Sequence, residues 1–231
     1  MVYFTGDIHG YAKEILRFGD KYNLTLDDVL VILGDVGANY YGERIDCHTK
    51  NILAKAGMTI LCIHGNHEIR PSNIPSYKLK TWNGGEVWYE ERHPHLLFAK
   101  DGEIYTIGKY RYIAIGGAYS VDKHSREENK NWWADEQPSD EIKERVESQL
   151  SNNEIDVVLS HTCPFKYIPT ECFLPSIRQS SVDQSTERWL DTIEERINYK
   201  AWFCGHWHTD KRIDKMHFLF EGYESEDNIR E

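Results

Sequence analysis

Eight residues that could bind metal ions or transfer protons follow short apolar runs in this sequence: Asp7, His9, Asp35, Asn66, His67, His161, His206 and His208. Carboxylate, imidazole and amide groups together form a donor set of intermediate hardness, which suits Mn²⁺, iron or Zn²⁺ better than Ca²⁺. The set is too large for one four-coordinate site. Its size instead predicts two metal ions that share a carboxylate.

Two metal ions about 3.5–4 Å apart can hold both the attacking and the leaving oxygen of an in-line displacement and can generate hydroxide near neutral pH. Phosphate esters hydrolyse extremely slowly without such help. Each of the eight residues taken singly could be an ordinary polar residue at a strand end. Their joint arrangement indicates a site that hydrolyses phosphate esters.

The elements that must position these residues are short buried strands. The runs 1–4, 29–33 and 59–63 are apolar, and helical segments at 11–22 and 50–56 separate them. This alternation predicts βαβ units and a parallel sheet. Ligand crevices in open α/β sheets lie at the carboxyl ends of the strands, where the polar residues collect here.

The second half of the chain has a different pattern of apolar and polar residues. Residues 86–119 predict an antiparallel meander in a second sheet region, and residues 120–138 predict a long loop. The predicted elements that follow are a helix from 139 to 150, a strand at 156–160, an irregular excursion at 163–184, a helix at 185–197, a strand at 201–204 and a hairpin at 211–223. We expect one domain over residues 1–231, with 220–231 as a frayed acidic tail.

Composition limits the partners. The formal net charge of −11 argues against a long nucleic-acid footprint, because phosphate contacts normally need a basic face, but it leaves a short oligonucleotide open. Five scattered cysteines do not form a disulfide framework and suit a reducing compartment. No apolar run approaches the roughly 20 residues of a membrane span, and the first residues lack a signal peptide. We therefore expect a cytoplasmic protein without a membrane partner; the oligomeric state is open.

Five motifs in order resemble those of the calcineurin-like metallophosphoesterase superfamily. They are Gly6-Asp7-Ile8-His9-Gly10, Gly34-Asp35, Gly65-Asn66-His67-Glu68, His161 and Gly205-His206-Trp207-His208. The resemblance implies an α/β fold in which two mixed sheets form a four-layer αββα sandwich flanked by helices.

The resemblance also implies roles for the eight residues. Asp7, His9 and His208 would hold the first metal, and Asn66, His161 and His206 would hold the second. Asp35 would bridge both and help to hold a nucleophilic hydroxide. His67 would stabilise or protonate the leaving-group oxygen as a general acid. The cofactors would be two divalent ions, Mn²⁺ above all, with Fe, Zn²⁺ and Ni²⁺ as alternatives.

One departure from the family pattern concerns the substrate. The first and third motifs, Gly6-Asp7-Ile8-His9-Gly10 and Gly65-Asn66-His67-Glu68, are similar to those of the serine/threonine protein phosphatases and diadenosine tetraphosphatases, in which the second motif continues to Asp-Arg-Gly. Here Val36 follows Asp35 and no Asp-Arg-Gly is present. Arg70 is a candidate replacement for the missing phosphate contact, or a structural pair.

Aromatic residues beside the motifs are candidate substrate contacts. Tyr40, Tyr41 and Trp207 could stack on a flat group, although such residues more often pack the core. The sequence predicts a dinuclear phosphohydrolase for mono- or diesters, acting on nucleotides or other small phosphate esters. A serine/threonine-type protein phosphatase and a non-catalytic scaffold with the same fold are the alternatives. The loops 120–138 and 163–184 are the expected specificity elements.

Overall fold

The computed structural model describes residues 1–229, and two mixed sheets form its centre. The first has seven strands in the order β13-β1-β2-β3-β6-β5-β4. Their bounds are β1 Val2–Thr5, β2 Val29–Ile32, β3 Thr59–Cys62, β4 Lys78–Trp82, β5 Gly85–Glu90, β6 His93–Ala99 and β13 Tyr223–Ser225. β1, β2 and β3 form a parallel series, as the alternating strands and helices predicted, and β6 continues this series in parallel beside β3.

The second sheet has six strands in the order β11-β12-β10-β9-β8-β7. Their bounds are β7 Ile104–Ile107, β8 Tyr110–Ile115, β9 Val157–Ser160, β10 Ala201–Cys204, β11 Lys211–Ile213 and β12 Met216–Phe218. β8, β9, β10 and β12 are parallel, and β7 and β11 pair antiparallel at the two edges.

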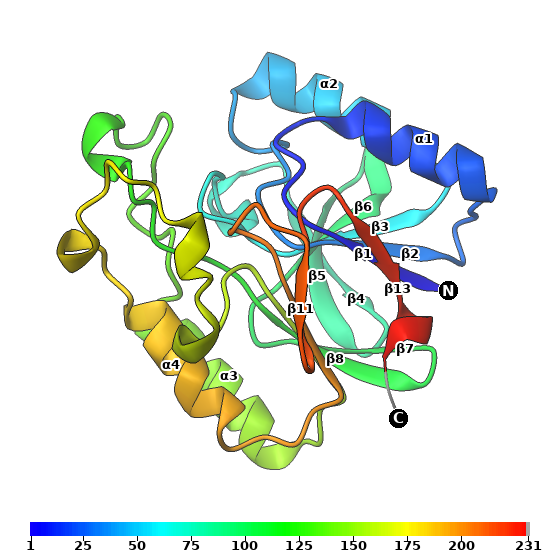
Figure 1. Ribbon diagram of the computed structural model, residues 1–231. Helices are drawn as coiled ribbons and strands as arrows, with labels where there is room; N and C mark the ends of the chain where they lie inside the picture. Colours follow the sequence, from blue (N-terminus) through cyan, green and yellow to red (C-terminus); the bar gives the residue numbers. More distant parts are fainter. Residues whose placement is uncertain (230–231) are drawn as a thin grey trace.

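Helices cover the outer face of each sheet, so the predicted four layers are confirmed (Figure 1). Apolar residues of α1 Ala12–Tyr22 and α2 Glu43–Leu53 pack on β2 and β3, and those of α3 Asp140–Asn152 and α4 Ser185–Glu194 pack on β8 to β10. The inner faces of the sheets share a third core, in which Phe4 and Phe203 stack with ring centroids 3.9 Å apart. The central strands read as continuous apolar runs because both of their faces are buried.

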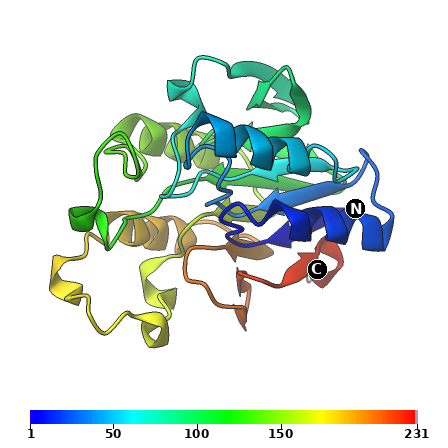
Figure 2. The ribbon, with the colours of Figure 1, turned by 90° about the horizontal axis from the view of Figure 1, so that it is seen from above.

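The long irregular segments lie on one side of the molecule. Residues 120–138 and 163–184 project to the left in both views, away from the chain ends (Figures 1 and 2). Within residues 1–229 no helix is long and apolar enough to cross a membrane. All five cysteines are free, which agrees with the absence of a disulfide framework in the sequence.

The structure corrects the predicted meander at 86–119. β5 and β6 belong to the first sheet, where Ile60 of β3 pairs with Leu96 of β6 in parallel. Only β7 and β8 enter the second sheet. The meander therefore divides between the sheets, and the chain crosses at the turn near Gly102, which has a φ of +83°.

Two other predictions are corrected. The helix placed at 50–56 is α2, which begins at Glu43 and ends at Leu53. The prediction missed its first turn because Glu43 and Arg44 are exposed and its buried residue there, Asp46, is polar, so no apolar period marks the turn. The tail at 220–231 was predicted to be frayed, but β13 pairs antiparallel with β1 and Tyr223 stacks on Phe18 at 4.0 Å between ring centroids. Ile229 is buried. Residues 230–231 lie outside the described residues.

Candidate metal centre

The eight predicted residues meet where five parallel strands end. Asp7 and His9 follow β1, and Asp35 follows β2. Asn66 and His67 follow β3, His161 directly follows β9, and His206 and His208 follow β10. The two sheets thus contribute to one cluster, as expected for the carboxyl ends of parallel strands.

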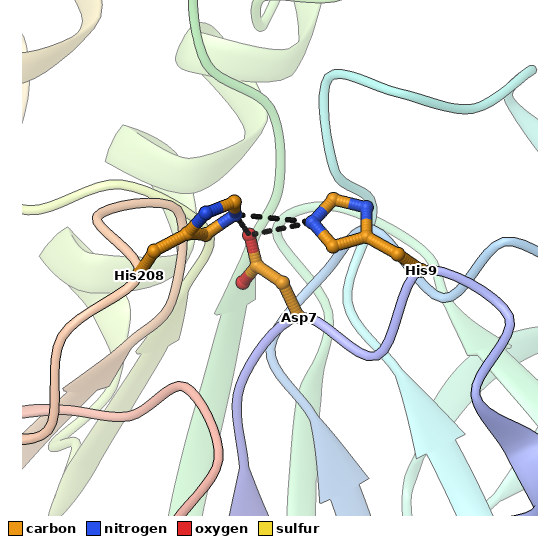
Figure 3. Close-up of side chains that lie close together, drawn as sticks. All are labelled: Asp7, His9 and His208. Atoms are coloured by element: carbon orange, nitrogen blue, oxygen red, sulfur yellow. Dashed lines mark hydrogen bonds and ion pairs between the residues drawn. The ribbon is translucent and has the colours of Figure 1, made fainter. Parts of the chain in front are cut away.

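Asp7, His9 and His208 form the first group of the cluster (Figure 3). The two Nε2 atoms lie 3.0 Å apart and point toward each other. Asp7 Oδ2 lies 3.4 Å from His208 Nε2 and 4.0 Å from His9 Nε2. This oxygen is buried and has no hydrogen-bond partner within residues 1–229. Two imidazole nitrogens therefore converge beside a buried carboxylate oxygen that needs a positive charge.

The second group surrounds the side-chain oxygen of Asn66. This Oδ1 lies 2.8 Å from His161 Nε2 and 3.0 Å from His206 Nδ1. His161 Nδ1 lies 2.7 Å from the Leu33 carbonyl, which can only accept, so that nitrogen carries the proton in the neutral ring. His161 Nε2 then directs a lone pair at the Asn66 oxygen, which is also an acceptor.

That pairing fits a metal site. The Asn66 amide nitrogen donates to Ser120 Oγ at 2.8 Å, which leaves Oδ1 facing the histidines. Two acceptors 2.8 Å apart repel unless a cation lies beside both. A histidine that donates its other N–H to a carbonyl is a common arrangement among metal ligands. The residues present therefore suit divalent metal ions.

Asp35 lies between the second group and His67. Its Oδ1 is 3.8 Å from His161 Nε2 and accepts a hydrogen bond of 2.7 Å from the His67 backbone N–H. Its Oδ2 is 4.0 Å from His67 Nε2. A second set of possible ligands, Asp7, Asp35 and His161, shares Asp7 with the first group.

The backbone around the ligands is strained. His9, Asp35, His206 and His208 have φ between +43° and +65°, which non-glycine residues seldom adopt. Strain of this kind costs energy and persists at sites where the surrounding structure fixes the residue. Close approach also requires glycine at position 34, because a Cβ there would lie 2.1 Å from His161 Nδ1.

Local charge prepares these groups for metal binding. Burial alone would raise the pKa of Asp7, but the His161 ring, the His208 ring 3.4 Å away and a hydrogen bond from the His206 backbone N–H outweigh it, so that pKa is lowered. Burial holds the pKa of His206 well below its ordinary value. The Asp7 carboxylate beside it raises the pKa of His208. The carboxylate of Asp7 and the neutral ring of His206 are thus the forms that coordinate metals.

An arginine that the sequence did not identify lies beside His67. Arg126 Nη2 is 3.3 Å from His67 Nε2, and its guanidinium is fixed by two bonds of 2.7 Å to Asp122. Its Nη1 donates to Tyr40 Oη at 2.8 Å. Burial lowers the pKa of His67, and Arg126 contributes to this, while Asp35 opposes it. The 120–138 loop was a predicted specificity element, but nothing in its composition singled out Arg126.

A cavity of about 480 Å³ opens beside the second group. Asp35, His67 and His206 form part of its floor. Its walls are largely apolar and come from Trp207 and from the 163–184 excursion, which contributes Phe173, Leu174 and Ile177. Buried Glu187 also lines it, accepts a 2.8 Å hydrogen bond from Thr162 Oγ1, and has its second oxygen without a hydrogen-bond partner among the described residues. Burial raises the pKa of Glu187 to about 7.

The four predicted substrate contacts fall in different places. Trp207 lines this cavity, and its ring lies 5.2 Å from that of His206. Tyr40 lies 5.8 Å from the His67 ring. Tyr41 is exposed on the surface and donates to the His9 carbonyl at 3.2 Å.

Arg70 is not placed to contact a phosphate. Its side chain is buried and forms an ion pair with Asp101, and its Nε donates to the Asp135 carbonyl at 2.8 Å. It does not line the cavity at the cluster. The interpretation of Arg70 as a structural pair fits these contacts, because its donors are used inside the protein.

Comparison with known proteins gives one short sequence match among characterised proteins. A 3-isopropylmalate dehydrogenase of Saccharolobus solfataricus is 39% identical over 51 residues. That match covers 22% of this chain and 15% of the dehydrogenase. The chain therefore spans a small part of that relative, and the match carries no functional inference.

Solved structures and a family model are more informative. TT1561 of Thermus thermophilus superimposes with a TM-score of 0.55 at 12% identity, over 96% of this chain and 88% of that one, which shows a shared fold. The sulfate thiohydrolase SoxB of Thermus thermophilus matches more weakly, with a TM-score of 0.36 at 11% identity over 92% of this chain and 36% of that one. The model of the calcineurin-like phosphoesterases matches residues 1–210. With the fold and the ligand cluster in place, the chain belongs to the calcineurin-like phosphoesterase family.

Proposed function

We propose that this protein is a dinuclear metal-dependent phosphohydrolase that acts on nucleotides or other small phosphate esters. The observation that carries the proposal is the pairing of His161 Nε2 with Asn66 Oδ1. With the His161 ring neutral, these are two acceptors 2.8 Å apart, an arrangement that a metal ion beside both would stabilise. Family membership supports a metal-dependent phosphoester hydrolase. The two ligand groups support two ions, with Asp7 or Asp35 as the shared carboxylate.

The residues of the chain have separable tasks in this proposal. Two divalent ions, when bound, would neutralise phosphate charge and lower the pKa of the attacking water. His67 lies at the edge of the cavity, where it can stabilise or protonate the leaving oxygen. Asp35 orients His67 through the hydrogen bond from its backbone N–H. Arg126, held by Asp122, fixes the His67 ring from the other side.

The substrate we propose is small. A cavity of about 480 Å³ matches a nucleotide-sized group and is largely apolar. The net charge of −11 disfavours long polyanions, although a short oligonucleotide remains compatible. We propose Mn²⁺ as the preferred ion, since nitrogen and oxygen ligands predominate, with Fe, Zn²⁺ and Ni²⁺ as alternatives. A cytoplasmic location without membrane partners remains part of the proposal.

The test is hydrolysis of chromogenic phosphate esters by the purified protein with and without Mn²⁺. Asp35→Asn should abolish most of the activity on every ester, and His67→Ala should abolish most of it on esters whose leaving oxygen needs a proton, whereas His95→Ala, an exposed position on β6, should change neither. Full turnover of such esters by both site variants would contradict the mechanism. Two bound metal ions without any turnover would favour the non-catalytic scaffold. Preference for a phosphoserine peptide over small esters would favour the protein phosphatase alternative.

A further inference from the structure

A second cavity adjoins the ligand cluster from the side of α1. It has a volume of about 780 Å³ and is lined by Asp7 and His9 of the first ligand group. The first cavity is lined by His67, His206 and His208. The two cavities share no lining residue, and each reaches a different part of the same cluster. The ligand residues therefore lie between two separate spaces.

The walls of the second cavity are rich in aromatic rings. Phe18 and Tyr223 stack with an interplanar angle of 8°, and Phe220 stacks on His208 with ring centroids 4.4 Å apart. Tyr11 and Tyr22 are 74% and 49% exposed, so their rings offer surface for a ligand. Flat groups bind well to such surfaces.

Charge around the second cavity is nearly balanced. Arg17 forms an ion pair with Glu14 on the same helix, and Lys21 lies 4.9 Å from the centroid of the Tyr22 ring. Glu221 adds a negative charge to the lining. A second phosphate would gain little from this environment. Aromatic contact is the recognition that these walls provide.

The two ligand histidines nearest this cavity are open to solvent. The side chain of His9 is 27% exposed and that of His208 is 50% exposed, whereas His161 is fully buried. A substrate can therefore extend past His9 and His208 from one cavity to the other. A phosphate monoester, which has one organic group, would fill only one of the two spaces.

We propose that the substrate is a phosphodiester with an organic group on each side of phosphorus, the leaving group in the first cavity and a retained aromatic group in the second. This inference rests on the proposed hydrolase function. Water forms the new bond to phosphorus, the bond from phosphorus to the leaving oxygen breaks, and that oxygen takes a proton. The products are a phosphate monoester and an alcohol or phenol. The leaving group belongs to the first cavity because His67 lines it.

The first test compares two diesters with the same leaving group. Bis-p-nitrophenyl phosphate retains an aromatic ring after cleavage, whereas methyl p-nitrophenyl phosphate retains a methyl group. We expect kcat/KM to favour the aromatic diester, and we expect Tyr11→Ala and Tyr22→Ala each to lower the ratio of the two values about three- to tenfold. Leu174→Ala, in the first cavity, and Leu79→Ala, exposed on β4, should leave the ratio unchanged.

The second test measures binding without turnover. Diphenyl phosphate and phenyl phosphate would be titrated calorimetrically into metal-loaded protein that carries His67→Ala, which should turn over phenyl esters about 10²–10⁴-fold more slowly. We expect Tyr22→Ala to weaken binding of diphenyl phosphate several-fold and to have a smaller effect on phenyl phosphate. Thermal melting of both variants checks that the fold is intact.

The outcomes separate the two proposals. An unchanged substrate ratio in Tyr11→Ala and Tyr22→Ala, with normal turnover in the wild type, would overturn this inference and leave the hydrolase function standing. A wild-type protein that hydrolyses neither diester nor monoester with two metal ions bound would contradict the hydrolase function. In that case the calorimetric comparison still decides whether the second cavity binds the retained group.

Discussion

The Nε2 atoms of His9 and His208 lie 3.0 Å apart, although 199 positions separate the two residues in the chain. Both rings are directed at the same point beside Asp7, whose buried Oδ2 has no hydrogen-bond partner among residues 1–229. The convergence is the geometry of a cation site. It also brings together the loop after β1, in the first sheet, and the loop after β10, in the second sheet.

Removal of metal ions should abolish hydrolysis and destabilise the fold. Chelation leaves the Asp7 carboxylate and the His161–Asn66 pair without a compensating charge, so we expect the melting temperature to fall and to recover with added Mn²⁺. Metal content by mass spectrometry should be two ions per chain and about one in His208→Ala. A melting temperature that does not respond to chelator or metal would contradict the site.

Replacement of His67 should matter most for poor leaving groups. A general acid contributes about 10²–10⁴-fold to the rate when the leaving oxygen needs a proton. We expect His67→Ala to lower kcat by that amount for phenyl esters and by much less for p-nitrophenyl esters, whose leaving group is stable as an anion. Equal losses for both esters would show that His67 acts in another way.

We expect Arg126 to hold the His67 ring in position and not only to pack within the 120–138 loop. Its guanidinium contacts Asp122, Tyr40 and the His67 ring at the same time. We expect Arg126→Ala to lower kcat about tenfold or more with a smaller change in KM, because the ring of His67 loses its support. Lysine cannot reproduce the planar, forked set of N–H donors of the guanidinium, so Arg126→Lys should recover little activity. Lys130→Ala, an exposed cation in the same loop, serves as the control and should have no effect.

Two glycines with similar φ should respond differently to alanine. Gly34 and Gly42 have φ of +104° and +91°, so alanine costs about 1–3 kcal/mol of backbone strain at either position. At Gly42 the added Cβ meets nothing within 4 Å, whereas at Gly34 it meets the His161 ring. Denaturant unfolding should therefore show a larger loss for Gly34→Ala, accompanied by weaker metal binding. Equal losses would mean that the His161 ring moves without cost.

Glu187 should make the stability of the protein depend on pH. Burial raises its folded pKa to about 7 from an ordinary value of 4.5, so the folded state binds the proton more tightly. Below the ordinary pKa the Glu187 carboxyl therefore does not change the free energy of unfolding. As pH rises toward the pKa of Glu187 in the folded state, the carboxyl lowers the free energy of unfolding by a growing amount. The full difference corresponds to about 3 kcal/mol at most.

Glu187→Gln removes this dependence and keeps an acceptor for Thr162. Urea unfolding of the variant and the wild type should give similar free energies at about pH 4, and the variant should be more stable at about pH 8. A wild type that is the more stable of the two at high pH would contradict the assignment, because it would mean that the ionised carboxylate has a favourable partner.

The ligand cluster was predictable because its signals are local. A buried parallel strand reads as an apolar run, and the residue after it must lie at the carboxyl edge of the sheet, so Asp7, Asp35 and His161 could be grouped without a structure. Which sheet receives β5 and β6 depends on pairing between distant strands, and the sequence pattern is the same for either choice. The predicted meander therefore failed at that point.

Residues held by tertiary contacts escaped prediction for a related reason. Arg126 reaches His67 only because the loop folds back over the cluster, and no period or spacing in 120–138 encodes that path. Arg70 lies two residues beyond the motif Gly65-Asn66-His67-Glu68, but its charge is paired with that of Asp101. The acidic C-terminal segment looked solvated, yet Tyr223 fits the aromatic group on α1 and draws the segment into the first sheet.

The position of β13 has a consequence for synthesis of the protein. β1 lies between β2 and β13, and the Val2 backbone N–H donates to Glu226, 224 positions away. Because the ribosome synthesises β1 long before β13, one edge of β1 stays open until Tyr223–Ser225 has emerged. The nascent polypeptide can pair β1 with β2, and β2 with β3, early. The first sheet can be completed only after β13 has been synthesised, and the metal centre only after His208.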